Sequence, residues 1–149
     1  MPIYKIEYTR IKVSDTTIGP IRVPSQTLPF LLEHCFPKEE NWREKSYLLL
    51  LDSANNLAGY TLIGVGGFEN VTFDIKLILK AALDCNASSV ILVHNHPTNN
   101  ILLSQADIVQ TEKLKKALGL VDIKLLDHII LGDDKFFSFV EERIIEYNL

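Results

Sequence analysis

The sequence lacks the features that mark disulfide-stabilised, membrane-spanning and secreted proteins. Its 149 residues include only two cysteines, Cys35 and Cys85, which lie in apolar patterns where a buried, reduced thiol is usual. No apolar run approaches the roughly 20 residues that cross a bilayer. Residues 1–5 carry no basic segment and no apolar core of the secretory kind. We therefore expect a cytoplasmic protein with no membrane partner.

An excess of positive charge is also missing. Lys and Arg number 15 against 19 for Asp and Glu, which gives a net charge of −4. The densest basic cluster, Lys113, Lys115 and Lys116, has the pattern of a solvated helix face. A phosphate backbone would meet no general electrostatic attraction, so nucleic acid is not an expected partner.

The composition itself is typical of one globular domain. The hydrophobic fraction is 47% and the charged fraction 23%, without a low-complexity tract or an internal repeat. A chain of this length buries roughly two-thirds of its unfolded surface without disulfides. We expect a single domain over residues 1–149, in which residues 1–40 are the least informative part. Within them, residues 3–13 alternate as a strand does, and residues 28–35 have the pattern of a short helix.

Apolar periodicity after residue 46 predicts an α/β or α+β fold with a mixed central sheet flanked by helices. Residues 88–93 are continuously apolar and rich in β-branched side chains, which predicts a central strand. The other expected elements are a hairpin of buried strands (47–51 and 57–63), a helix that spans 75–82 and stops near Asn86, a helix from Ser104 to Gly119, two strands (123–131 and 135–139), and a terminal helix after Val140. Gly64, Gly66 and Gly67 favour a flexible connection over a phosphate-binding loop, because the Gly-Lys-Ser/Thr ending is missing.

The most informative stretch begins where the central strand ends. His94 and His96 are one residue apart, and the carboxylate of Asp107 follows eleven positions after His96. Two imidazoles and one carboxylate suit zinc, and three protein ligands leave a position open for water, as catalytic zinc sites do. Ser104 has the place of a helix cap, with Asp107 in the first helical turn. We expect one zinc ion per chain, and each imidazole needs an acceptor for its other ring nitrogen.

These residues carry a resemblance to a known family. The pattern His94-x-His96, seven residues, then Ser104-x-x-Asp107 resembles the metal motif of the JAMM (JAB1/MPN/Mov34) metallopeptidase superfamily. Residues 87–97 and 125–132 are similar to its bacterial RadC-like branch in particular. The resemblance covers about residues 44–131 and implies a cytidine-deaminase-like JAB/MPN architecture. It also implies hydrolysis of an amide bond in a peptide or protein by a metal-activated water.

The resemblance implies further roles for individual residues. Glu44 stands where the family has its general acid/base, although the nearby Glu39 and Glu40 leave the register open. Ser104 would donate a hydrogen bond to the oxyanion while it also caps the helix. Asp127 and His128 are candidates for hydrogen bonding to the ligands, and His34 has no partners that indicate a second metal site.

The chain departs from the RadC-like pattern in one loop. Thr98-Asn99-Asn100 replaces the usual Ser-Gly-Asp, and Leu103 replaces a proline before the motif serine. Residues 1–40 contain no counterpart of the family's helix-hairpin-helix region, which indicates a stand-alone domain. Two alternatives therefore stay open: a JAB-fold binding module without hydrolytic activity, and a RadC-type protein associated with DNA repair. The sequence is also compatible with a homo-oligomer.

Overall fold

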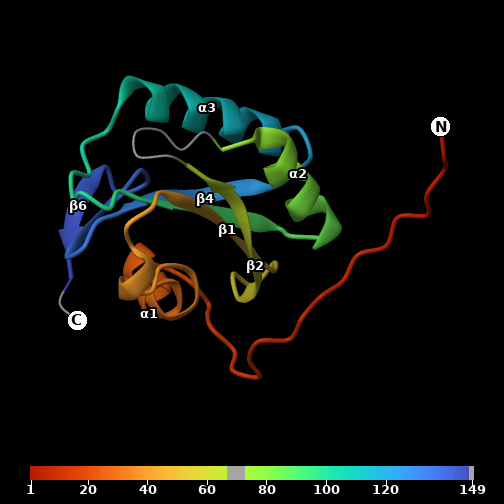
Figure 1. Ribbon diagram of the computed structural model, residues 1–149, viewed down its shortest axis with the longest axis horizontal. Helices are drawn as coiled ribbons and strands as arrows, with labels where there is room; N and C mark the ends of the chain where they lie inside the picture. Colours follow the sequence, from red (N-terminus) through yellow and green to blue (C-terminus); the bar gives the residue numbers. More distant parts are fainter. Residues whose placement is uncertain (67–72, 148–149) are drawn as a thin grey trace.

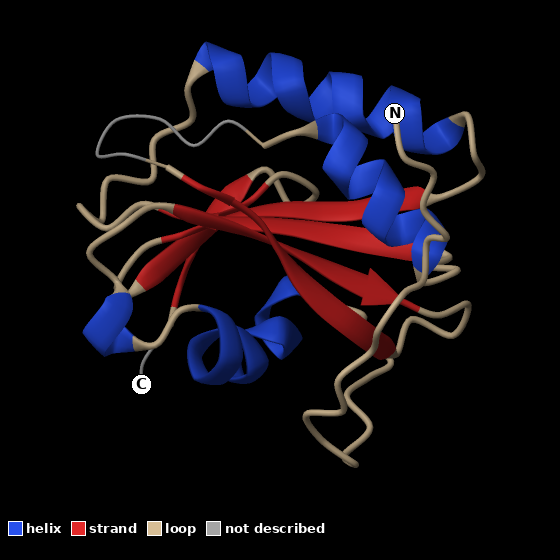
Figure 2. Cartoon of the chain, turned by 45° about the vertical axis from the view of Figure 1, so that its right-hand side comes forward, coloured by secondary structure: helices blue, strands red, loops and turns tan. Residues whose placement is uncertain are grey.

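The middle layer of the protein is a mixed β-sheet (Figures 1 and 2). The computed structural model describes residues 1–66 and 73–147, so Gly67 lies outside the described residues. Within them, six strands follow the order β2-β1-β3-β4-β5-β6. Only β3 and β4 are parallel; the other neighbours are antiparallel. The strands are β1 (Lys45–Leu51), β2 (Leu57–Val65), β3 (Ser89–Asn95), β4 (Lys124–Leu131), β5 (Lys135–Ser138) and β6 (Arg143–Glu146).

Helices cover both faces of this sheet. Helices α2 (Ile75–Asp84) and α3 (Gln105–Gly119) lie on one face, and α3 provides the crossover that the parallel pair β3–β4 requires. The opposite face is covered by a short helical run (Figure 2). That run comprises η1 (Pro24–Thr27), α1 (Leu28–Phe30) and η2 (Leu31–Cys35), and η3 (Lys38–Glu40) follows it.

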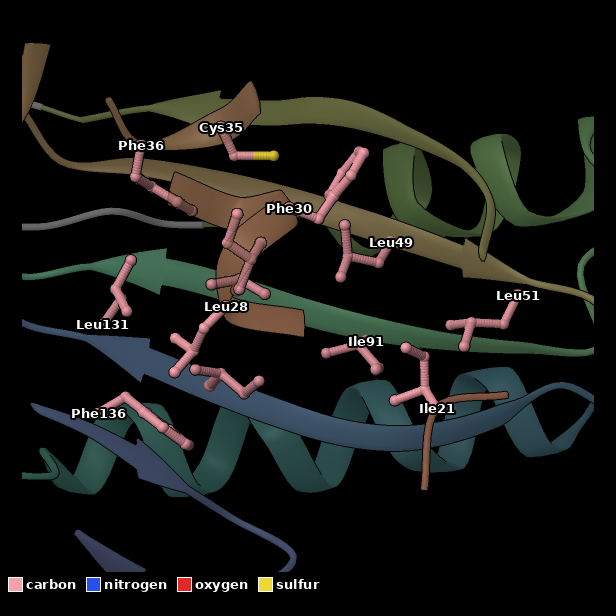
Figure 3. Close-up of a cluster of buried hydrophobic side chains, with 13 residues drawn as sticks. Ile21, Leu28, Phe30, Cys35, Phe36, Leu49, Leu51, Ile91, Leu131 and Phe136 are labelled. Atoms are coloured by element: carbon pink, nitrogen blue, oxygen red, sulfur yellow. The ribbon is translucent and has the colours of Figure 1, made fainter. Parts of the chain in front are cut away.

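Each face of the sheet has its own hydrophobic core. In β1, Leu49 and Leu51 pack toward α1 and η2, whereas Leu48 and Leu50 pack toward α2 and α3. Because alternate side chains enter different cores, a strand covered on both faces has a continuous apolar sequence. Figure 3 shows the first core, in which Phe30, Cys35 and Phe136 meet the side chains of the central strands. Both cysteines are free, and burial raises the pKa of Cys35 to about 12.

The structure confirms most of the predicted elements. The hairpin β1–β2, the helix that ends before Asn86, the central strand β3, the helix from Ser104 to Gly119 and the pair β4–β5 all form. The hairpin is not buried throughout, however, because β2 is an edge strand whose residues are mostly half-buried or exposed. No helix in the described part of the chain is long and apolar enough to cross a membrane.

Two predicted elements are wrong. Residues 3–13 form no strand, since alternation makes a segment competent for pairing but does not supply the neighbouring strand that it needs. The segment after Val140 forms a turn and then strand β6 instead of a helix. There, Ile144 and Ile145 pair with Phe137 and Phe136 of β5, and so short a segment would be marginal as a helix.

Candidate metal centre

The candidate metal ligands lie where β3 ends and α3 begins. His94 is 4% exposed and is the penultimate residue of β3, a strand that is paired on both sides. The chain stays attached to the sheet beyond it, because the His96 amide donates to the Leu131 carbonyl at 2.8 Å. The start of α3 is fixed by a reciprocal cap: Ser104 Oγ accepts from the Asp107 amide at 3.0 Å, and Asp107 Oδ2 accepts from the Ser104 amide at 3.1 Å.

These elements bring the two histidines together and place Asp107 near His94. His94 Nε2 lies 3.2 Å from His96 Nε2 and 3.9 Å from Asp107 Oδ1. Ligand atoms about 2.0–2.1 Å from a tetrahedral zinc ion are separated by about 3.3 Å, so the two nitrogens already have this spacing. The carboxylate is somewhat farther away. As they stand, no three His, Cys, Asp or Glu side chains in residues 1–66 and 73–147 are grouped to hold a metal ion.

The proton positions on the histidines follow from their partners. Thr111 Oγ1 donates to the Asp107 carbonyl at 2.6 Å, so its oxygen can only accept from His128 Nδ1 at 2.7 Å. His128 Nε2 is then a bare acceptor, and His94 Nδ1 donates to it at 2.8 Å. This chain of hydrogen bonds leaves His94 Nε2 without a proton.

His96 reaches the same state by a shorter route. Its Nδ1 lies 2.6 Å from the Asn100 carbonyl, which can only accept, so Nδ1 carries a proton and Nε2 is bare in the neutral ring. The two Nε2 atoms therefore lie side by side, with the Asp107 carboxylate near His94. The hydrogen bond from His96 Nδ1 to a backbone carbonyl is of the kind that orients metal-binding imidazoles.

Burial keeps the inner histidines neutral. The apolar surroundings, reinforced by His96 and opposed by Asp107, lower the pKa of His94 to about 4. His128 is fully buried between Phe139, which stacks on its ring at 4.6 Å, and Phe73, which meets it edge-on. This burial lowers the pKa of His128 well below its ordinary value. At neutral pH both rings hold the uncharged form that metal binding needs.

Of the two residues predicted to hydrogen-bond to the ligands, only His128 does so. His128 contacts His94 directly, whereas Asp127 is engaged elsewhere. The Asp127 carboxylate accepts from Ser138 Oγ at 2.6 Å and from the amides of His128 and Val140, which secures the end of β5. Neighbouring residues of a strand point to opposite faces, so only one of the two can face the ligands.

Thr111 was not among the predicted site residues. It lies one helical turn after Asp107 in α3, and its buried hydroxyl links that residue to His128. The i, i+4 spacing from a predicted ligand on a helix was the available signal.

Glu44 immediately precedes β1 and is half-buried, and its carbonyl accepts from the Gly66 amide at 2.9 Å. The adjacent Lys45 amide donates to Asn95 Oδ1 at 2.7 Å, which holds this part of the chain beside the end of β3. The two glutamates that left the register open are exposed in η3, where Glu40 pairs with Lys45 at 3.1 Å.

The divergent loop after the histidines is tied to the rest of the molecule. Asn99 adopts a left-handed backbone conformation with φ 60°, and its side chain bonds the Asp133 amide at 2.8 Å and Asp134 at 3.1 Å. Asn100 supplies the carbonyl that orients His96. The asparagines of this chain therefore fix the loop.

Comparison with known proteins identifies the family of the chain. The model of the RadC-like JAB domain matches residues 21–144. Among curated proteins, the chain is similar to UPF0758 proteins of Haemophilus ducreyi (42% identity, 71% of this chain and 48% of the relative), Actinobacillus pleuropneumoniae (38%, 77% and 53%) and Flavobacterium johnsoniae (37%, 72% and 45%). The chain thus spans about half the length of these relatives. With the matched region including every ligand candidate and the mixed sheet that carries them, the chain belongs to the family of RadC-like JAB domains.

Proposed function

We propose that this domain is a zinc-dependent hydrolase of the metallopeptidase or isopeptidase type, which cleaves an amide bond in a peptide or protein. The observation that carries this proposal is the pair of Nε2 atoms 3.2 Å apart, with the Asp107 carboxylate 3.9 Å from His94 Nε2. Membership of a JAB-fold family supports it.

His94, His96 and Asp107 would hold the metal. The imidazoles need no rearrangement, and Asp107 Oδ1 needs to approach His94 by roughly half an ångström to reach tetrahedral spacing. When bound, zinc supplies a water of lowered pKa and polarises the scissile carbonyl.

Glu44 and Ser104 supply the remaining chemistry in this proposal. Glu44 takes a proton from the attacking water and returns it to the leaving amine, which is general acid/base catalysis. Its place beside the end of β3 supports this assignment. Ser104 Oγ accepts from the Asp107 amide, and this bond leaves the hydroxyl hydrogen able to donate to an oxyanion.

Metal analysis tests the first part of the proposal. The full chain, stripped with chelator and reloaded, is expected to bind about one zinc ion. His94→Ala and His96→Ala should lose the metal, while His34→Gln, which alters a histidine packed between Phe30 and Tyr60, should retain it. Absence of zinc uptake by the folded wild-type chain at neutral pH would contradict the proposal.

Activity tests the second part. Against a library of peptides and isopeptide-linked substrates, Glu44→Gln should bind zinc but lose hydrolysis. Glu39→Gln and Glu40→Gln are matched controls that should remain active, because both residues are exposed and outside the site. Hydrolysis that survives Glu44→Gln and disappears in one of the controls would assign the base to that residue.

A JAB-fold binding module without hydrolytic activity is the second candidate function. Two observations favour this candidate. Asp107 Oδ1 lies 3.9 Å from His94 Nε2, and the described part of the chain has no grouped set of three ligands. This candidate predicts that zinc-loaded wild-type protein cleaves no member of the library. The DNA-associated alternative predicts salt-sensitive DNA binding, which the net charge of −4 does not favour.

A further inference from the structure

Strand β2 is an edge strand whose register with β1 is interrupted at two points, but it lacks the charges and proline that commonly protect an edge against pairing. Its nine residues include no charged side chain and no proline, and Leu62 and Val65 are 47% and 49% exposed. The other edge, β6, is four residues long and carries Arg143 and Glu146 at its ends. Native proteins normally shorten, charge or cover an edge, since its free amides and carbonyls pair readily with another strand. The edge of β2 therefore calls for a covering segment.

The N-terminal arm, residues 1–17, has the properties of such a segment. Tyr4, Ile6 and Tyr8 alternate with polar residues, and their exposed fractions are 74%, 69% and 61%. Ile11 and Val13, 82% and 53% exposed, lie on the other face of an extended chain, so the apolar row changes sides after Tyr8. Lys5 and Glu7 pair with each other at 2.6 Å, and the described part of the chain gives residues 1–13 no backbone hydrogen bond to the domain. The arm runs outside the sheet in Figure 1 and meets the domain at Tyr8, whose ring centroid lies 5.2 Å from Lys80 Nζ of α2.

The root of the arm already lies at the start of β2. The Leu57 amide donates to the Ile18 carbonyl at 2.8 Å, and the Ile21 amide donates to the Asn55 carbonyl at 2.8 Å. These bonds run in the antiparallel sense. If the arm paired with β2 of its own chain in this register, residues 10–17 would lie beside residues 58–65. The polar segment 14–17 would then cover half of β2, and Ile3, Tyr4, Ile6 and Tyr8 would extend past its end.

We infer that two copies of this chain exchange their arms, and that residues 3–13 of each add a strand to the β2 edge of the other. Eleven extended residues span about 36 Å and nine span about 30 Å, so the apolar part of the arm matches the edge in length. Exchange satisfies the free backbone groups of β2 and places arm side chains beside Leu62 and Val65. The interface closes by two-fold symmetry, as in other exchanged dimers. It is independent of the proposed hydrolase function.

Light scattering of the full chain tests this inference. The expected mass is twice the 16.9 kDa of one chain. The double variant Ile6→Lys/Tyr8→Lys places charges on the apolar row of the arm and should weaken dimerisation by about 100-fold or more. Leu62→Lys should do the same from the edge strand. Lys5→Ser/Glu7→Ser changes the opposite row of the arm and should leave the dimer intact.

Hydrogen exchange distinguishes exchange from pairing within one chain. Amides of residues 3–13 and of β2 should gain protection as protein concentration rises. A wild-type chain that stays monomeric at high micromolar concentration overturns the inference, and so does a dimer that both lysine variants leave intact. Arm protection that is independent of concentration also overturns it, in favour of pairing with the chain's own β2. Circular dichroism of each variant verifies that the domain remains folded.

Discussion

A single hydroxyl, that of Thr111, determines the proton positions at the candidate metal site. Because Thr111 accepts from His128 Nδ1, the proton of His94 is held on Nδ1 and its Nε2 faces the other ligands. Without that acceptor, His128 can move its proton to Nε2. His94 would then have to carry its own proton on Nε2, where a metal must bind. Thr111, which lies in α3 one turn after Asp107, therefore controls which ring nitrogen of His94 carries the proton.

We predict that Thr111→Val weakens zinc binding by about 10- to 100-fold, the usual cost of removing a group that orients a metal ligand. Competition titration against a chelating dye measures the effect. Thr111→Ser is the matched control, since it retains the hydroxyl and loses only a methyl group. Equal zinc affinity of the valine variant and the wild type would show that the hydrogen-bond chain does not set the state of His94.

At the level of elements, helix α3 uses Ser104 for two tasks that substitutions can separate. The serine caps the helix, and we propose that it also donates to an oxyanion. Replacement of a cap by Ala costs about 1 kcal/mol, whereas Gly costs only a few tenths, because its backbone is better tolerated at that position. Neither residue can donate from a side chain.

Ser104→Gly should therefore keep nearly the wild-type stability and lose about 100- to 1,000-fold in kcat, the usual effect of removing one oxyanion donor. Ser104→Ala should show the same loss of activity and, in addition, the lower stability. Urea unfolding and steady-state kinetics measure the two quantities. If the glycine variant retains full activity, the serine serves the helix alone.

Strands β4 and β5 are joined by a buried carboxylate, which makes their stability depend on pH. Burial raises the pKa of Asp127 above its ordinary 3.8, and bonds from Ser138, Val140 and His128 oppose that shift in part. A raised folded-state pKa means that the native protein holds this proton more tightly than the unfolded chain. The stabilising contribution is present below the ordinary pKa and is lost as pH rises through the folded-state value.

Relative to Asp127→Asn, the wild type should therefore lose free energy of unfolding as pH rises from about 3.8 toward neutrality. Denaturant unfolding of both proteins across this range measures the difference. Zinc affinity should be the same in both, because the Asp127 carboxylate bonds the end of β5 and not the ligands. A wild type that gains stability relative to Asp127→Asn as pH rises would contradict the assignment.

The elements that carry the site could be predicted because local rules determine them. A continuously apolar run gave β3, and the Ser104-x-x-Asp107 cap gave the start of α3. Residues whose state depends on partners could not be predicted in this way. The arm alternates like a strand but has no neighbour, β6 exists because β5 pairs with it, and Thr111 matters through a histidine 17 residues away.

On the scale of the whole molecule, the candidate ligands come from three different parts of the fold. His94 belongs to the sheet, His96 to the loop tied to the β4–β5 turn, and Asp107 to a helix of the outer layer. The unfolded chain cannot hold these three groups together. A metal that needs all three therefore binds the native state more tightly than the unfolded chain, which offers only the local pair His94 and His96, and this difference adds to the stability of the domain.

Zinc at about 100 times its dissociation constant should raise the free energy of unfolding by about 2.7 kcal/mol. For a domain of this size that corresponds to an increase in Tm of about 5–11 °C. Differential scanning calorimetry with and without zinc measures it, and chelator should reverse it. His94→Ala should show no increase, while His34→Gln should respond like the wild type. An equal increase in the Tm of His94→Ala would place the stabilising ion at some other site. If the ion binds at the proposed site, removal of one of its three ligands must abolish the stabilisation by zinc.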